Sequence, residues 1–241
     1  MNLLNKILFG TKYGICAFCG RRIERNNAVF HKDNICICKN CNSRIDVAPF
    51  LYTYDGTKHL SFTVAPLYYT GIIRDAIHKL KFSAMDGIAE ALSYYVLTYL
   101  EVFETTDESL LKDFDFLVPV PLSPERFSER GYNQAEIIAK AISEKFNIPL
   151  RTDILIKIKD TRPQSTLSRN EREANIKDAY NCTKDVCGKN IILIDDVFTT
   201  GYTLDYCAKA LKEQGADNVI AITVTHGTQK GHSDIYYDLF S

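Results

Sequence analysis

The feature that most constrains the fold is an apolar run followed directly by two acidic residues and a hydroxyl-rich turn. The run Ile-Ile-Leu-Ile at positions 191–194 is typical of a central strand buried on both faces. Asp195 and Asp196 come next, at the carboxyl end of this strand, which is the edge where open α/β sheets bind ligands. A turn at 199–201 then opens a helix. This order of elements predicts an α/β sheet with a ligand site at its carboxyl edge.

The residue types in this segment indicate a ligand with two kinds of polar group. Backbone N–H groups at a helix start, together with the hydroxyls of Thr199, Thr200 and Thr203, can hold a phosphate monoester, and Gly201 lets the backbone approach it. Carboxylates repel phosphate but suit the diol of a ribose. The segment therefore points to a ribose 5-phosphate. The alternative is a strand ending in Asp, followed by a helix with Thr203 as its N-cap.

The rest of the C-terminal half alternates between strand and helix patterns. Strands are expected at 116–120, 153–158, 191–194 and 219–224, with helices at 133–146 and 203–214. Such alternation predicts a mainly parallel sheet with crossover helices. Upstream, we expect a strand within 60–69 and helices at 72–80 and 87–102, followed by a solvated loop at 101–115 that holds six acids and one lysine.

Cysteines are concentrated near the start of the chain, where five of the eight lie between positions 16 and 41. Cys16, Cys19, Cys38 and Cys41 form the frame C-x2-C-x18-C-x2-C, which is a structural zinc spacing. Two such knuckles complete a closed tetrahedron, so the site is expected to be a scaffold. Cys36 could replace Cys38, His31 could serve only if one cysteine dropped out, and free buried thiols are the remaining alternative.

Composition describes a folded chain with a small basic head. The 241 residues are 46% hydrophobic and 24% charged, with a formal net charge of −1 that gives no global attraction for nucleic acid. Positions 1–48 nevertheless carry eight Lys or Arg against three acids. We place a zinc-binding module at 1–50 and an α/β domain at 51–241.

No segment of the sequence predicts a membrane span or a nucleotide-driven motor. The longest uncharged stretch, 59–73, is 15 residues and contains Pro66 and Gly71, short of the ~20 apolar residues that a spanning helix needs. No signal-peptide pattern is evident at the start, so we expect a cytoplasmic protein. No G-x-x-x-x-G-K-[ST] motif occurs.

The segment 191–204 is similar to the PRPP signature of type I phosphoribosyltransferases: four hydrophobic positions, two acids and a Thr-Thr-Gly-x-Thr turn. The resemblance implies a type I phosphoribosyltransferase-like fold, with a mainly parallel sheet and helices on both faces. It also implies that Asp195 and Asp196 take the ribose hydroxyls of PRPP and that residues 199–203 bind its 5-phosphate. Tyr202 departs from the small residues common in this turn.

Three further segments resemble the ComF-type competence proteins, which join a double zinc-ribbon module to a type I phosphoribosyltransferase domain. The first is Val-Pro-Val-Pro-Leu-Ser-Pro-Glu-Arg at 118–126 with Arg-Gly-Tyr-Asn-Gln at 130–134. Here the resemblance makes Ser123 and Arg126 candidates for the pyrophosphate, whereas exposed charge is the alternative for Arg126 and Arg130.

The second is the pattern Gln-x-x-Leu-x-x-x-x-Arg-x-x-Asn at 164–175. In type I enzymes the corresponding mobile loop closes over the reaction centre, which makes nearby Arg162 a catalytic candidate alongside Asp195, Asp196 and Arg126. An ordinary solvated loop is the alternative.

The third is the segment 68–82, which holds a run of basic residues. Arg74, His78, Lys79 and Lys81 form this run, and Phe82 could stack on a base. Single-stranded DNA is one expected partner of this face; a merely solvated helix face is the alternative.

Together the resemblance implies a protein of natural transformation that binds PRPP with Mg²⁺, carries a structural zinc and contacts single-stranded DNA. Competence helicase or motor components and DNA-processing proteins are the further partners it implies. Two other functions stay open at this point: a PRPP-sensing module without catalysis that binds DNA or a partner, and a phosphoribosyltransferase of base salvage.

Overall fold

A computed structural model describes residues 12–48, 51–52, 57–82, 86–104, 110–159 and 175–227 of the chain. Side chains at 51, 52, 82, 86 and 103 are outside this description. Across the described ranges, no helix combines the length and apolar character needed to cross a bilayer.

The N-terminal part forms a small four-stranded sheet. Its strands are β1 (Tyr13–Cys16), β2 (Arg22–Glu24), β3 (Ala28–Lys32) and β4 (Ile35–Cys38), in the order β2-β1-β4-β3. The pair β1 and β4 is parallel and the other two pairs are antiparallel. A 3-10 turn, η1 (Arg25–Asn27), and a short helix, α2 (Lys39–Asn42), complete the unit. We call this unit, residues 12–48, the cysteine module.

The main sheet has the order β5-β6-β12-β11-β8, with β7 also paired to β12. These strands are β5 (Leu51–Tyr52), β6 (Thr63–Val64), β7 (Leu67–Tyr68), β8 (Phe116–Pro119), β11 (Asn190–Phe198) and β12 (Asn218–His226). All pairings are parallel except that of β5 with β6. The two longest strands, β11 and β12, lie side by side in the centre, so apolar residues fill both of their faces.

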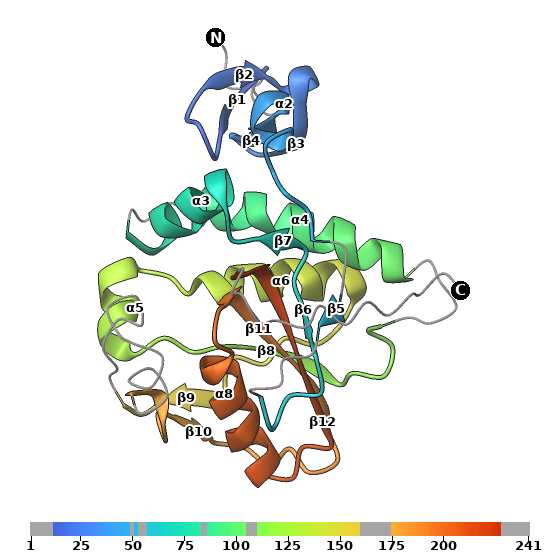
Figure 1. The fold of residues 1–241 in the computed structure, drawn as a ribbon, viewed down its shortest axis with the longest axis vertical. Coiled ribbons are helices and arrows are strands. Elements are labelled where there is room, and N and C mark those ends of the chain that lie inside the picture. The colour runs from blue at the N-terminus through green and yellow to red at the C-terminus, as the bar shows by residue number, and fades with distance from the viewer. Residues whose placement is uncertain are drawn as a thin grey trace, which may run out of the picture.

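Helices cover both faces of this sheet (Figure 1). On one face lie α3 (Gly71–Phe82), α4 (Asp86–Glu104) and α6 (Gln134–Phe146), and on the other lies α8 (Tyr202–Glu213). Alternate residues of β11 reach different core clusters, since Ile192 and Ile194 join the first and Ile191 and Leu193 join the second. This confirms the expected mainly parallel α/β fold with helices on both faces.

The cysteine module packs on the outer side of α4. Phe18 stacks near Tyr95 with ring centroids 6.4 Å apart, and the Tyr95 hydroxyl donates to Asn42 Oδ1 at 2.8 Å. A Cβ at Gly87 would come within 2.7 Å of Ile35 Cδ1, so glycine allows the close approach of helix and module. Figure 1 shows α3 and α4 between the module and the sheet.

Some expectations about elements differ from the structure. The segment expected as a strand at 153–158 forms β9 (Leu155–Lys157), which pairs antiparallel with β10 (Tyr180–Cys182) in a separate two-stranded sheet. Residues 101–104 of the expected acidic loop are the last turn of α4. The sequence also did not predict α5 (Pro124–Arg130). Alternating or acidic patterns report exposure, and they do not specify which strand is the neighbour.

Candidate functional site

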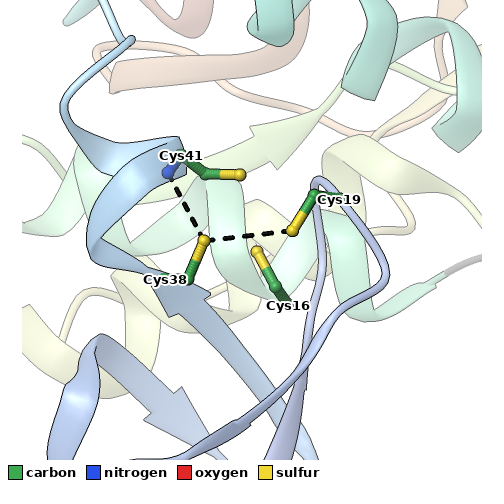
Figure 2. Close-up of side chains that lie close together, drawn as sticks. All are labelled: Cys16, Cys19, Cys38 and Cys41. Atoms are coloured by element: carbon green, nitrogen blue, oxygen red, sulfur yellow. Dashed lines mark hydrogen bonds between the residues drawn. The ribbon is translucent and has the colours of Figure 1, made fainter.

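Four cysteines converge in the cysteine module. Cys16 ends β1, Cys19 follows in the next turn, Cys38 ends β4, and Cys41 lies in α2. Their sulfur atoms all lie within 4.8 Å of one another (Figure 2). The sulfurs of Cys19 and Cys38 are 3.9 Å apart, close to the ~3.8 Å edge of a tetrahedron with Zn–S bonds of about 2.3 Å. The cluster can therefore hold one metal ion.

Cys36 does not belong to this group of four sulfurs, whereas Cys38 does. Cys36 is fully buried inside β4, where its sulfur lies 3.1 Å from the position of a Cβ on Gly14. Residues two apart on a regular strand lie on the same face, but here Cys38 ends β4, caps α2 and accepts the N–H of Cys41 at 3.4 Å. His31 is exposed on β3, outside the cluster.

Backbone geometry favours a thiolate at Cys16, whereas burial raises the pKa of Cys38 and that of Cys41. Burial disfavours the charged form of Cys16, but backbone N–H groups of Cys38, Cys19 and Phe18 outweigh this effect and lower the pKa of Cys16 to about 7. A thiolate is the form that binds metal.

A second polar centre lies near the end of β11, where two adjacent carboxylates meet a lysine. Asp196 is 3% exposed, and its Oδ2 lies 2.9 Å from Lys81 Nζ. Asp195 is partly buried, and its Oδ1 accepts the N–H of Asp196 at 2.8 Å. Burial and the neighbouring Asp196 raise the pKa of Asp195 to about 8, although Lys81 acts in the opposite direction. One lysine does not use all the acceptor oxygens of two carboxylates, so the pair can still accept hydrogen bonds from a ligand.

The turn after β11 has a conformation and a packing that require glycine. Gly201 has φ +74, and a Cβ there would lie 2.9 Å from both Phe198 Cζ and Thr57 Cγ2. Gly201 is the N-cap of α8 and provides no side-chain cap, in contrast to the alternative in which Thr203 caps the helix. Thr200 is 1% exposed, and its hydroxyl oxygen has no hydrogen-bond partner among the described residues. Thr199, Tyr202 and Thr203 are partly buried around this turn.

One cation of α5 interacts electrostatically with Asp196. Burial lowers the pKa of Arg130, while Asp196 acts to raise it and Arg126 to lower it, so the three charges influence one another. Arg130 also donates from Nη1 to Gln134 Oε1 at 3.2 Å. Ser123 is the N-cap of α5, where its hydroxyl accepts the N–H of Arg126 at 3.4 Å. Arg162 lies outside the described residues.

The four basic residues expected to form one face of α3 have different surroundings. Arg74 is exposed and 3.5 Å from Asp75, and His78 is also exposed. Lys79 donates to the carbonyl of Phe18 in the cysteine module at 3.3 Å. Lys81 contacts Asp196. The side chain of Phe82 lies outside the described residues.

Sequence reasoning missed two sets of contacts. One is that of Lys81 with the carboxylates, and the other is that of residues 57–59, which we call the strap, with α8. Asp205, in the first turn of α8, accepts the N–H groups of Lys58 and His59 at 2.7 and 2.8 Å, and its Oδ2 lies 3.2 Å from His59 Nδ1. This places Thr57 against Gly201. No local signal in the sequence could show these contacts, because the partners are 115 to 147 positions apart.

Comparisons with known proteins agree with this arrangement. The phosphoribosyl transferase domain model matches residues 132–241. DNA utilization protein YhgH of Escherichia coli (strain K12) is 30% identical over 209 residues, covering 85% of this chain and 86% of that protein. Competence protein F of Haemophilus influenzae is 27% identical over 86% of this chain and 88% of that protein.

Two further similarities cover only part of this chain. Competence protein ComFC of Bacillus subtilis is 35% identical over 150 residues, which are 61% of this chain and 56% of that protein. Among solved structures, the allosteric regulatory enzyme of purine biosynthesis aligns at 22% identity with a TM-score of 0.38, over 61% of this chain and 29% of that one.

Proposed function

Because this chain belongs to the family of ComF-type competence and DNA utilization proteins, we propose that it binds PRPP together with Mg²⁺ at the carboxyl end of β11. One juxtaposition carries the proposal. The carboxylates of Asp195 and Asp196 precede a tight turn in which Thr200 offers a buried hydroxyl without a partner among the described residues. These two groups match the two polar ends of a ribose 5-phosphate.

In this proposal the carboxylates accept hydrogen bonds from the ribose hydroxyls. The 5-phosphate lies at residues 199–203, where N–H groups at the start of α8 and threonine hydroxyls point to it. The reverse orientation would place a phosphate against two carboxylates, which is electrostatically unfavourable.

The pyrophosphate end would lie toward α5. Arg130 interacts electrostatically with Asp196, and Arg126 with Arg130, so both supply positive charge at this end, and Arg162 remains a sequence-based candidate for the same role. Mg²⁺ bound to the pyrophosphate would neutralise part of its charge. In a transfer reaction the bond from ribose C1 to the pyrophosphate oxygen breaks, pyrophosphate leaves with the electron pair, and an acceptor atom bonds to C1. Cations at the leaving group and carboxylates at the ribose favour this separation of charge.

Pyrophosphate release distinguishes a transferase from a protein that only senses PRPP. PRPP and Mg²⁺ would be mixed with the protein and candidate nucleobases or single-stranded DNA. Release that depends on one acceptor identifies a transferase, including one of base salvage. Measurable PRPP affinity without release identifies a sensor.

The PRPP site itself is tested by replacing Asp195 and Asp196 together with asparagine. We expect calorimetric titration to show loss of PRPP binding while circular dichroism stays unchanged. Asp217→Asn is a matched control, because Asp217 is an exposed carboxylate just before β12, at the opposite edge of the sheet. Wild-type affinity in the double variant would refute the assignment.

For the cysteine cluster we propose a structural zinc held by Cys16, Cys19, Cys38 and Cys41. Sulfur spacing close to a tetrahedral edge supports zinc. Four thiolates leave no open position for water, so the ion would stabilise the module that residues 1–50 are proposed to form. Binding of the metal would then contribute directly to folding.

We also propose contact with single-stranded DNA through exposed cations of α3 and the cysteine module. The printed names of the relatives refer to DNA utilization and competence, and Arg74, Arg21 and Arg22 are exposed. Replacing Arg74 and Lys79 with alanine while keeping Lys81 should weaken binding of an oligonucleotide. The slope of the logarithm of the binding constant against the logarithm of the salt concentration should become shallower by about 0.7 for each lost phosphate contact. An unchanged slope would place the DNA elsewhere.

A further inference from the structure

The last turn of α3 contacts three different parts of the molecule. Lys79 Nζ donates to the carbonyl oxygen of Phe18, between the first two cysteines of the cluster, at 3.3 Å. The carbonyl oxygen of Leu80 accepts the hydroxyl of Tyr132 at 2.7 Å. Lys81 Nζ lies 2.9 Å from Asp196 Oδ2. This turn therefore joins the cysteine module, the segment before α6 and the carboxylates at β11.

Helix geometry explains how one turn reaches both sites. Successive residues of an α-helix are rotated by about 100°, so Lys79 and Lys81 leave α3 in nearly opposite directions. The apolar side of the turn is fixed, because Ile77 and Leu80 are fully buried. Tyr132 holds the helix end from a third direction. Lys81 is thus attached to a rigid element, which is the arrangement that positions a functional group accurately.

Lys81 contacts the pair of carboxylates at Asp196, so its charge state bears on theirs. Several described groups interact electrostatically with these carboxylates: Lys81 and Arg130 with Asp196, and Tyr180 and Cys207 with Asp195. Tyr69 acts on Lys81, and Arg126 acts on Arg130 and Tyr180. Burial acts against the ammonium group of Lys81, but Asp196 outweighs it and raises the pKa of Lys81, so the lysine stays charged. Only 29% of the Lys81 side chain and 4% of the Asp196 side chain are exposed, so solvent screens this ion pair less than a pair at the surface.

We propose that Lys81 is a positioning residue of the PRPP pocket, whose ammonium group holds the Asp196 carboxylate in place to accept a ribose hydroxyl. The ion pair places the positive charge of Lys81 directly beside two adjacent carboxylates. The inference rests on the proposed PRPP site and adds a residue from α3, outside the 191–204 segment. Through Lys79, the same helix turn ties this residue to the cysteine module.

The test compares Lys81→Met and Lys81→Arg by calorimetric titration with PRPP and Mg²⁺. Removing a cation in contact with a carboxylate raises the carboxyl pKa by about one unit or more, and each unit reduces the ionised fraction tenfold below that pKa. Lys81→Met should therefore bind PRPP about tenfold more weakly at about pH 7. Because Asp195 has a pKa of about 8 in the wild type, the difference in PRPP affinity between wild type and Lys81→Met should narrow above that pH. Lys81→Arg should restore most of the affinity.

A matched control and a measurement without ligand separate this inference from the PRPP proposal. Lys140→Met removes an exposed lysine from α6 and should leave PRPP affinity unchanged. Without ligand, the fall in melting temperature of Lys81→Met relative to wild type should grow as pH rises through about 8, where the carboxyl of Asp195 ionises in the wild type.

Equal affinity of Lys81→Met and wild type, or an affinity loss that does not depend on pH, would overturn the positioning role and leave the PRPP site standing. Absence of PRPP affinity in the wild type would overturn both. A melting difference that does not change with pH would show that the ion pair makes no electrostatic contribution.

Discussion

Replacing Asp195 with asparagine is expected to stabilise the protein in the absence of ligand. Burial and the adjacent Asp196 raise the pKa of Asp195 to about 8, from an ordinary value of 3.8. The folded state therefore holds a proton that the unfolded state has released between these two pH values. Since the unfolded state binds fewer protons in this window, the free energy of unfolding falls as pH rises through it. Asparagine removes this penalty and keeps an oxygen for the N–H of Asp196.

The size of the gain follows from the pKa difference. A difference of about four units, at 1.36 kcal/mol each, sets an upper bound of about 6 kcal/mol near pH 8. Asp195 retains solvent contact and shares its proton with Asp196, so we expect a gain of about 2 kcal/mol. For a chain of this size, that gain corresponds to a rise in melting temperature of roughly 4–8 °C.

Thermal unfolding of the ligand-free variant and wild type at about pH 5 and about pH 8 measures this effect. The gain should be large at the higher pH and small at the lower one, where the wild-type carboxyl is already protonated. Asp115→Asn should instead lower the melting temperature, because Lys189 and the N–H of Asn190 lower the pKa of Asp115. Equal melting temperatures at about pH 8, or a gain independent of pH, would refute the reasoning.

Two further predictions concern the metal cluster and the turn. Cys38→Ser should lose stoichiometric zinc, measured by elemental analysis, whereas Cys36→Ser should keep it; retention in both would exclude Cys38 as a ligand. Gly201→Ala should lower the free energy of unfolding by about 1–3 kcal/mol and weaken PRPP binding, because of the positive φ and the contact with Phe198. Denaturant titration measures the first effect, and an unchanged midpoint would contradict it.

Local patterns made much of the fold and part of the site predictable. The apolar run at 191–194 indicated a buried strand because a central parallel strand is apolar on both faces, and that strand is β11. The two C-x2-C pairs indicated a metal cluster because each pair brings two sulfurs together in one short turn, and their sulfurs do converge. The helix expected at 133–146 is α6, which begins one residue later because Asn133 is its N-cap.

Partner choice between distant segments was not predictable in this way. Periodicity records which side of an element is buried, and it carries no information on what buries it. The segment 153–158 has the composition of a sheet strand, yet β9 pairs with β10. The four basic residues of α3 look equivalent in the sequence, but their surroundings differ. Two of them face solvent, Lys79 contacts the cysteine module, and Lys81 contacts Asp196.

The sequence alone thus determined the elements whose chemistry is contiguous: the cysteine pairs, the strand that ends in Asp195 and Asp196, and the turn that opens α8. Only the tertiary structure decided that Cys36 lies outside the cluster, that Asp205 anchors the strap at 57–59, and that Lys81 reaches Asp196. Contiguous residues are held together by covalent geometry, whereas contacts across more than a hundred positions depend on the path of the whole folded chain.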